Sequence, residues 1–205
     1  MRRRCTLGCG RGRLKVISTY TALAYGSWAV LFLVWLPGYF TSKKTVARPE
    51  RGRQVGALIF IWAGFTFMFN SGGWGSFLGT RLTPRTGLPA PIGLALDLVG
   101  VLFAIWARLT IGRNWSNVIA LKEKHELVQT GPYGIVRHPI YTGMSLAVLG
   151  TAMTTGSLAA YLGFVCMMVG LLIRIQSEDR LMAAQFPETH PAYRQRTRKL
   201  VPFIW

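Results

Sequence analysis

Acidic residues are scarce in this chain of 205 residues, which has seven Asp and Glu against 24 Lys and Arg and a net charge of +17. All charged residues together make up 15% of the sequence, whereas about 25% is usual for a soluble domain. Cysteines are few as well, because Cys5, Cys9 and Cys166 are odd in number and lack the spacing of a disulfide framework or a metal site. These shortages argue against a soluble domain and a disulfide-stabilised domain, and we expect no metal.

Apolar residues, by contrast, are abundant. Hydrophobic side chains form 51% of the sequence, and several runs reach roughly the twenty residues that a helix needs to cross a bilayer. Five spans are predicted, over residues 16–36, 55–77, 92–109, 139–154 and 158–175. Thr155-Gly156-Ser157 predicts a tight turn that makes the last two spans a helical hairpin. The expected fold class is all-α, a polytopic membrane helical bundle that forms a single integral membrane domain over residues 1–205.

Most Lys and Arg residues lie in the loops between the spans. With the N-terminus outside, 16 of the 24 face the cytoplasm and 8 face outward. Cytoplasmic loops are enriched in Lys and Arg, so we expect the N-terminus outside and the C-terminus inside. The six basic residues before the first span favour the reverse orientation. An amphipathic segment with Leu181, Met182 and Phe186 continues the fifth span, and we expect it to be cytoplasmic.

A net charge of +17 also fits a protein that binds nucleic acid. The basic residues, however, flank apolar spans instead of gathering on one face, so we expect no nucleic-acid partner. Membrane lipids are the expected surroundings. No pattern in the sequence indicates a particular oligomeric state.

A Gly-Pro turn and the step Arg137-His138-Pro139 open directly into the fourth span. Helix starts have unpaired N–H groups and a partial positive charge, so they attract anionic groups. In a functional interpretation, Arg137 holds an anionic substrate, His138 hydrogen-bonds a ligand, and Tyr133 and Tyr141 contact it with their rings. The structural alternatives are a membrane-flanking arginine, a helix-capping histidine and tyrosines at the membrane interface.

Arg174 and Glu178 lie four positions apart near the end of the fifth span, so they share one helix face. They form either a structural ion pair or a binding pair. In the binding pair, Arg174 grips a carboxylate in a bidentate manner and Glu178 binds a ligand hydroxyl or amine. Asp97 lies inside the third span, where an ionisable residue is costly and is a candidate for function.

Taken together, these motifs resemble a known family. The run Gly131-Pro-Tyr-Gly-Ile-Val-Arg-His-Pro-Ile-Tyr-Thr-Gly143 is similar to the signature of the isoprenylcysteine carboxyl methyltransferases and their prokaryotic relatives. Gly112-Arg-Asn-Trp-Ser116 and His125-Glu-Leu-Val128 upstream resemble it as well. Downstream, the family's pattern is matched by Arg174-x-x-x-Glu178-Asp179, Phe186, Tyr193 and Val201-Pro-Phe203. The resemblance covers about residues 100–205, and it departs at Pro187, where glycine is usual, and at His190, where tyrosine is usual.

The resemblance implies S-adenosyl-L-methionine as the cofactor and methyl transfer at the membrane face. It implies N-terminal spans in residues 1–90 and a cofactor-binding methyltransferase core in residues 91–205. The residues that it implies for cofactor binding are Ala120, His125, Glu126, Leu127, Val128, Tyr133, His138, Pro139, Ile140, Tyr141 and Glu178. Arg174 matches the family position that contacts the substrate, and with Arg137 we assign it to the reaction. The expected location is the inner (plasma) membrane of a prokaryote, with the catalytic face in the cytoplasm.

The chemistry agrees with a carboxylate acceptor. A carboxylate is already a nucleophile, so it needs alignment but no general base, and such positioning supplies about 7–11 kcal/mol. We therefore expect carboxyl O-methylation of a lipophilic or isoprenylcysteine-like acceptor that enters from the membrane. Amine N-methylation of a phospholipid is the first alternative, and it fits less well because an ammonium must first lose a proton.

Two further alternatives differ in cofactor. Membrane reductases of the sterol-reductase type have a similar Arg-His-Pro-x-Tyr step and use NADPH, but they typically place an acidic residue after the tyrosine, where this chain has Thr142-Gly143. A basic membrane scaffold is the non-enzymatic alternative, and it predicts no cofactor binding.

Overall fold

A computed structural model describes residues 19–41, 45–47, 51–70, 73–84, 87–112, 121–122 and 127–201. The long helices of this part of the chain are α1 Thr19–Thr41, α2 Arg51–Phe69, α4 Pro89–Ile111, α5 Pro139–Thr155 and α6 Leu158–Gln185. The short elements are α3 Gly75–Leu78, the 3-10 turn η2 Gly131–Gly134, α7 His190–Arg196, and strand β1 Thr45–Ala47 paired with β2 Leu121–Lys122. The predicted helical membrane bundle is confirmed, with one short antiparallel strand pair added.

Among the described helices, four contain stretches that are long and apolar enough to cross a membrane: Thr19–Pro37, Arg51–Phe69, Pro89–Ile111 and Leu158–Gln185. Helix α5 is shorter, with 17 residues, and it forms the predicted hairpin with α6. Gly156 makes the turn between them with a φ of 70°, a left-handed conformation that glycine adopts without steric cost.

One predicted span is interrupted. The sequence predicts a helix over residues 55–77, but α2 ends at Phe69, a turn follows at Asn70, and α3 is a separate single turn. Gly75 at the start of α3 has a φ of 71°, which a continuous α-helix does not allow. Helix α6, in contrast, continues through the amphipathic segment as predicted and ends at Gln185, two residues before Pro187.

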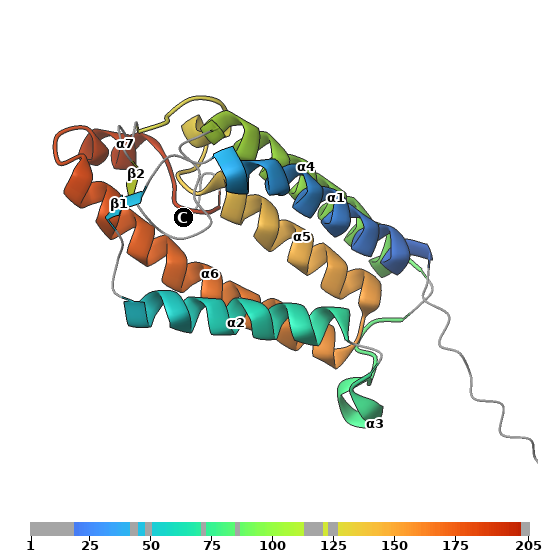
Figure 1. Cartoon of the computed structure of the whole chain (residues 1–205). Coiled ribbons are helices and arrows are strands. Elements are labelled where there is room, and N and C mark those ends of the chain that lie inside the picture. The colour runs from blue at the N-terminus through green and yellow to red at the C-terminus, as the bar shows by residue number, and fades with distance from the viewer. Residues whose placement is uncertain are drawn as a thin grey trace, which may run out of the picture.

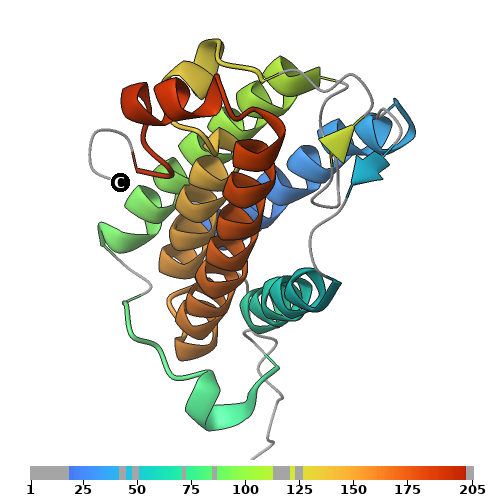
Figure 2. The same cartoon turned by 90° about the vertical axis from the view of Figure 1, so that its left-hand side faces the viewer.

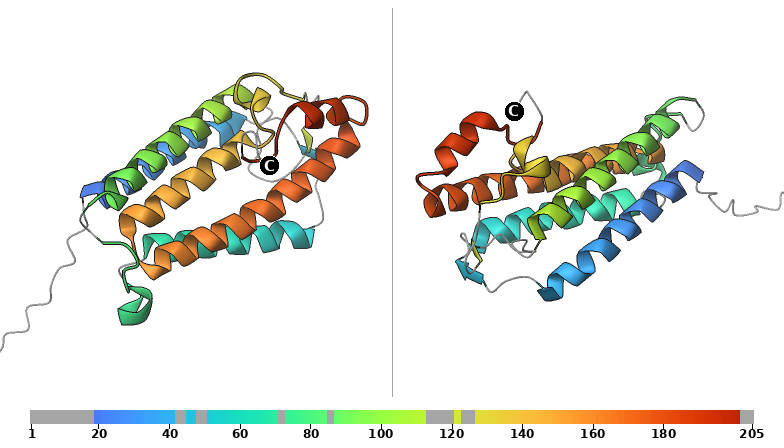
Figure 3. Two further views of the ribbon diagram at one scale, coloured as in Figure 1. Left: turned by 180° about the vertical axis from the view of Figure 1, so that it is seen from behind. Right: turned by 90° about the horizontal axis from the view of Figure 1, so that it is seen from above.

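The helices associate in two close pairs, α4 with α5 and α2 with α6 (Figures 1 and 3). In α4, α5 and α6, two glycines seven residues apart line the contact face, because two helical turns return to the same side of a helix. In α2, Gly64 alone does so. A Cβ atom added to Gly93 of α4 would lie 2.7 Å from the carbonyl oxygen of Gly150 of α5. One added to Gly64 of α2 would lie 2.8 Å from the carbonyl oxygen of Gly163 of α6. Small residues at this spacing let membrane helices approach backbone to backbone.

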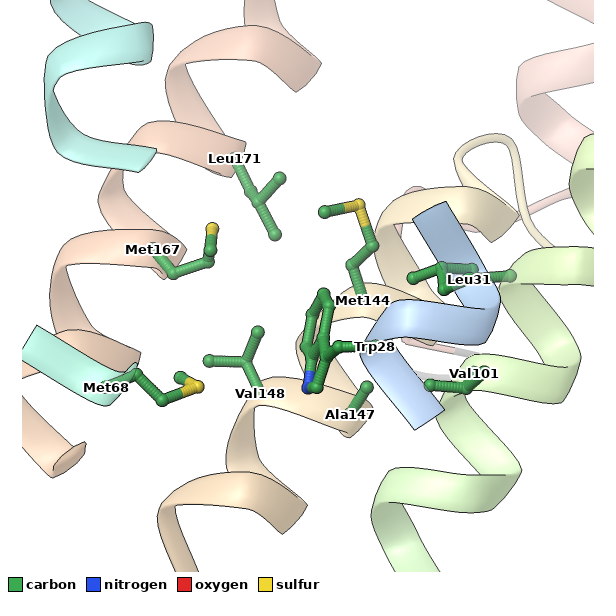
Figure 4. Close-up of a cluster of buried hydrophobic side chains, with 10 residues drawn as sticks. Trp28, Leu31, Met68, Val101, Met144, Ala147, Val148, Met167 and Leu171 are labelled. Atoms are coloured by element: carbon green, nitrogen blue, oxygen red, sulfur yellow. The ribbon is translucent and has the colours of Figure 1, made fainter. Parts of the chain in front are cut away.

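A cluster of large apolar side chains fills the space between the two pairs. Figure 4 shows Met68 of α2 and Met167 and Leu171 of α6 facing Met144 and Val148 of α5. Trp28 reaches into this cluster from α1 and is 1% exposed. Methionine is flexible and polarizable, so it fills an irregular interface of this kind. The core therefore lies where the two helix pairs meet.

Asp97 lies inside the bundle and is enclosed by hydroxyl groups. Its carboxyl accepts a hydrogen bond from the hydroxyl of Ser27 on α1 at 2.5 Å and one from the hydroxyl of Thr151 on α5 at 2.8 Å. The Thr151 hydroxyl in turn accepts from the indole N–H of Trp28 at 2.9 Å. Thr151 lies about 15 Å along α5 from Tyr141, at 1.5 Å per residue. Asp97 thus ties α1, α4 and α5 together at a distance from the Arg137-His138-Pro139 step.

Candidate active site

The residues that carry the family resemblance gather at one end of the bundle. Figure 2 shows the start of α5, the C-terminal half of α6, the η2 turn and α7 together at this end. Local sequence positions the elements here. Gly131 begins η2 with a φ of 57°, and Pro139 occupies the first turn of α5, where a missing N–H costs no hydrogen bond. His138 is the residue that precedes α5.

Tyr141, Arg174 and Glu178 form the centre of the site. The hydroxyl of Tyr141 donates a hydrogen bond to the carboxylate of Glu178 and accepts one from Nε of Arg174 at 3.0 Å. The guanidinium carbon of Arg174 also lies 5.9 Å from the centre of the Tyr141 ring. The direct separation between Arg174 Nη2 and Glu178 Oε1 is 3.7 Å, too long for a hydrogen bond. Tyr141 therefore connects the two charged residues more closely than they contact each other.

His138 lies between two carboxylates that are neighbours in sequence. Its Nε2 atom is 2.9 Å from Oδ1 of Asp179, and its Nδ1 atom is 3.6 Å from Oε2 of Glu178. Burial lowers the pKa of His138, but the hydrogen bonds to Asp179 and Glu178 outweigh this effect, and the net shift is upward. The imidazole also stacks against the Tyr141 ring, with centroids 5.9 Å apart. In a chain with only seven acidic residues, two of them serve this one histidine.

Tyr133 adds a buried aromatic ring on the η2 side. Its backbone carbonyl accepts a hydrogen bond from the hydroxyl of Tyr193 on α7 at 2.7 Å. Burial, with a further contribution from Glu178, raises the pKa of the Tyr133 phenol, and burial raises that of Tyr193 to about 12. Both phenols therefore stay neutral near pH 7.

Arg137 faces a different direction. Its Nη1 atom donates to the backbone carbonyl oxygens of Thr197 and Arg194, and its Nε atom lies 3.8 Å from Asp179. These contacts hold the segment that follows α7. The contacts that the structure describes for Arg137 are with other parts of the protein. Its assignment to the reaction stays a prediction.

The other predicted residues are placed as follows. Pro139 is buried in the first turn of α5, and Ile140 packs against the apolar core. Leu127 and Val128 are half-buried in the approach to η2. Ala120, His125 and Glu126 lie outside the described residues. The structure therefore brings Tyr133, His138, Tyr141, Arg174 and Glu178 together at one end of the bundle.

Sequence reasoning did not assign a role to Asp179. The residue follows Glu178 directly and is part of the matched C-terminal pattern, so a signal for it existed. Its link to His138, which lies 41 positions earlier in the chain, appears only when α5 and α6 are packed together.

Known proteins are similar to this end of the bundle. The model of the phospholipid methyltransferase family matches residues 90–189, a range that contains α5, α6 and all of α4 except Pro89. Protein-S-isoprenylcysteine O-methyltransferase B of Arabidopsis thaliana is 30% identical over 115 residues, which is 55% of this chain and 58% of that protein. Over about half of its length, the chain is similar to the isoprenylcysteine carboxyl methyltransferases. The resemblance predicted from the sequence motifs is thereby confirmed.

Other relatives have different names. The cobalt-zinc-cadmium resistance protein CzcN of Cupriavidus metallidurans is 36% identical over 118 residues, which is 55% of this chain and 50% of that protein. Methanethiol S-methyltransferase 2 of Bradyrhizobium diazoefficiens is 41% identical over 74 residues, which is 36% of this chain and 27% of that protein. The chain spans about half the length of the first curated relatives it matches.

A solved structure shares the fold. The eukaryotic intramembrane Ras methyltransferase ICMT (isoprenylcysteine carboxyl methyltransferase) matches with a TM-score of 0.55 and 19% sequence identity. The match covers 92% of this chain and 70% of the other. The likeness therefore extends over the N-terminal helices as well, which the sequence motifs did not reach.

Proposed function

We propose that the chain is an S-adenosyl-L-methionine-dependent integral membrane methyltransferase that methylates the carboxylate of a lipophilic or isoprenylcysteine-like acceptor. The observation that carries this proposal is the Tyr141 hydroxyl, which is shared by Glu178 and Arg174 at one end of a membrane bundle. The relatives named as methyltransferases support the class of reaction. The acceptor, the cofactor and the roles of individual residues are our proposals.

The residues of the site fit the proposed cofactor. S-adenosyl-L-methionine has a cationic sulfonium, an amino group, a carboxylate and an aromatic base. Glu178 suits the amino group or a ribose hydroxyl, and protonated His138 suits the carboxylate. The buried ring of Tyr133 and the half-buried ring of Tyr141 suit the sulfonium or the base, because aromatic faces attract cations and stack on planar rings.

When bound, the cofactor would supply a methyl group on its sulfonium sulfur. A carboxylate oxygen would bond to the methyl carbon as the C–S bond breaks, so that a methyl ester forms and the sulfur leaves as a neutral thioether. Arg174 would hold that carboxylate through N–H groups of its two terminal nitrogens, while its Nε–H bond to Tyr141 fixes the direction of the guanidinium. No residue needs to remove a proton from the acceptor. The burial of His138 and Tyr133 keeps water away from the reacting groups, which strengthens the charge interactions.

A lipophilic acceptor follows from the position of Arg174. This residue lies in α6, within the stretch that is long and apolar enough to cross a membrane. Its side chain is 11% exposed. An acceptor whose polar end reaches Arg174 can leave its apolar part among the lipids. A free, water-soluble carboxylate would gain nothing from this location.

Phospholipid N-methylation is the second candidate, because the matching family model is that of the phospholipid methyltransferases. The two candidates assign different roles to Glu178 and Arg174. A carboxylate acceptor needs the guanidinium of Arg174, whereas an amine acceptor needs an anion or a base. Incubation with labelled cofactor and either a farnesylcysteine or phosphatidylethanolamine distinguishes them. We expect a base-labile methyl ester from the first and no methylated amine from the second.

Cofactor binding tests the proposal directly. His138→Ala and Tyr141→Ala should each weaken S-adenosylhomocysteine binding at least tenfold, or about 1.4 kcal/mol, measured by calorimetric titration of the purified protein. Each variant removes one of the groups that we place against the cofactor. Tyr161→Ala is the matched control, because this tyrosine lies in the first turn of α6, at the other end of the bundle.

Unchanged affinity in both variants would move the cofactor pocket to another part of the chain. A parallel titration with NADPH separates a reductase from a methyltransferase, because we expect the reduced dinucleotide not to bind. Binding of neither ligand by the wild-type protein would favour the scaffold alternative.

We propose that the site end faces the cytoplasm of a prokaryote and that the membrane is the inner membrane. With the native cysteines replaced by serine, an impermeant thiol reagent should label Ser76→Cys in intact cells and leave Glu188→Cys unlabelled. Both positions are exposed, Ser76 in α3 and Glu188 just before α7 at the site end. Labelling of Glu188→Cys from outside would reverse the orientation.

A further inference from the structure

We propose that Asp179 and the C-terminal segment (residues 197–201) position His138, so that this segment is part of the active site. Asp179 is then a positioning residue, since it acts through His138 and not on a ligand. The proposal rests on the proposed function in one respect, namely that His138 contacts the cofactor. It adds a residue and a segment that the resemblance left without a role.

The backbone of the C-terminal segment is bonded to the backbone just before α5. Val136 and Arg198 form a parallel bridge, and the N–H of Arg137 donates to the carbonyl of Arg198 at 2.7 Å. The N–H of His138 donates to the carbonyl of Lys199 at 3.1 Å. These bonds join parts of the chain that are some sixty residues apart, and they fix the path of the backbone that carries the His138 side chain.

A side chain of α5 adds to this attachment. The hydroxyl of Thr142 donates to the carbonyl of Leu200 at 2.6 Å. The segment is thus fixed both to the residues before α5 and to its first turn. Loss of the segment would release two backbone N–H groups and one hydroxyl in a mostly buried region.

Asp179 joins the same segment to the imidazole of His138. Its Oδ1 atom lies 2.9 Å from His138 Nε2, and its Oδ2 atom lies 3.6 Å from the ammonium of Lys199. Arg137 Nε lies 3.8 Å from Oδ1. A carboxylate can only accept a hydrogen bond, so Nε2 carries the proton in this contact. The ring is thereby held against Tyr141 with Nδ1 toward Glu178.

The structural alternative is that Asp179, Lys199 and Arg137 simply fasten the end of the bundle. The two interpretations differ in the state of the imidazole. Burial lowers the pKa of His138, and hydrogen bonds to Asp179 and Glu178 raise it further than burial lowers it. The charged or titratable groups around this contact are Glu178 and Asp179 on α6, Tyr141 on α5, Arg137 before α5, His190 and Arg194 on α7, and Lys199.

The sign of the pH effect follows from this upward shift. The contribution of the charged imidazole to the stability of the folded protein is complete at low pH. It is lost as pH rises through the folded-state pKa of His138. Removing the Asp179 charge moves that loss to lower pH. A plain fastening role would change the stability of the protein without moving the titration of His138.

The experiment uses the full-length protein in detergent and two readouts. The first is S-adenosylhomocysteine affinity by calorimetry. The second is the titration of His138, followed by NMR of ring-labelled histidine. The chain has only three histidines, so the signal that disappears in His138→Gln identifies His138. The variants are Asp179→Asn, Asp179→Glu and Lys199→Met. Arg180→Met is the matched control, because it removes an exposed charge next to Asp179 on the same helix.

We expect Asp179→Asn to weaken S-adenosylhomocysteine binding about tenfold, the effect of losing a charged hydrogen bond, and to lower the midpoint of the His138 titration. Asp179→Glu should recover part of the affinity, and Lys199→Met should show a smaller loss in the same direction. Arg180→Met should behave like the wild type in both readouts.

A wild-type affinity and an unmoved His138 titration in Asp179→Asn would overturn the positioning role. If Asp179→Asn does not fold, Asp179→Glu and Lys199→Met decide in the same way. If the wild-type protein does not bind S-adenosylhomocysteine, the proposed function fails. The His138 titration then still shows whether Asp179 positions the imidazole.

Discussion

Replacing Arg174 by lysine is expected to reduce methyl transfer on the order of a hundredfold or more and to leave S-adenosylhomocysteine affinity within a few-fold of the wild type. Lysine retains the positive charge but lacks the planar fork that holds a carboxylate in a bidentate manner. An acceptor that is held by one point can rotate away from the methyl group. The measurement is turnover with a farnesylcysteine acceptor, beside calorimetric titration with S-adenosylhomocysteine.

Glu178→Gln should have the opposite profile. It preserves the shape of the side chain and removes the charge that accepts from Tyr141, so cofactor affinity should fall by roughly 1–3 kcal/mol. Arg180→Lys is the control for Arg174→Lys, because Arg180 lies on the same helix with its side chain exposed. It should leave both turnover and affinity unchanged.

A structural ion pair predicts a different pattern. Both single variants would then lower the melting temperature alike, and the double variant would be little worse than either single one. The separation of 3.7 Å between Arg174 Nη2 and Glu178 Oε1 is too long for a hydrogen bond, so the two charges are linked through the Tyr141 hydroxyl and not by direct contact. Strong coupling in stability, without a difference between the two ligand effects, would leave the acceptor site unassigned.

Much of this architecture follows from local patterns in the sequence. Runs of apolar residues predicted the long helices, and Pro139 and Gly156 marked the start of α5 and the turn after it. The prediction extended past Phe69 to Phe77, although Asn70, Gly72 and Gly73 lie between them and weaken a helix. The turn at Asn70 and the positive φ of Gly75 show that the helix does not continue.

In the candidate site, too, some features follow from local sequence and others depend on how the helices pack. Arg174 and Glu178 were predicted on one helix face because a spacing of four residues is a property of the helix itself. The sharing of the Tyr141 hydroxyl and the contact between His138 and Asp179 depend on how α5 and α6 are placed along each other. No single-helix pattern contains that information. The attachment of residues 197–201 beside Val136 is equally non-local.

The placement of α5 depends in turn on its contact with α4, and this contact is sensitive to a single methyl group. A Cβ atom added to Gly150 would lie 2.8 Å from Cα of Asp97 and closer still to Asp97 N and to the carbonyl oxygen of Gly93. All three are backbone atoms, which cannot rotate away as a side chain can. The two helices would have to separate, and Thr151 would then move away from Asp97 and leave its carboxyl short of a donor.

Gly150→Ala should therefore destabilise the protein by about 1–3 kcal/mol or more, the cost of overpacking a close interface. Thermal unfolding in detergent, followed by tryptophan fluorescence, measures the effect, and Gly150→Leu should prevent folding altogether. Gly26→Ala in α1 is the matched control, because a Cβ atom there meets nothing within 4 Å. Alanine is a better helix former than glycine, so Gly26→Ala should be neutral or stabilising by up to about 1 kcal/mol. If Gly150→Ala melts like the wild type, α4 and α5 do not pack this closely, and the position of His138 and Tyr141 relative to the rest of the bundle must have another cause.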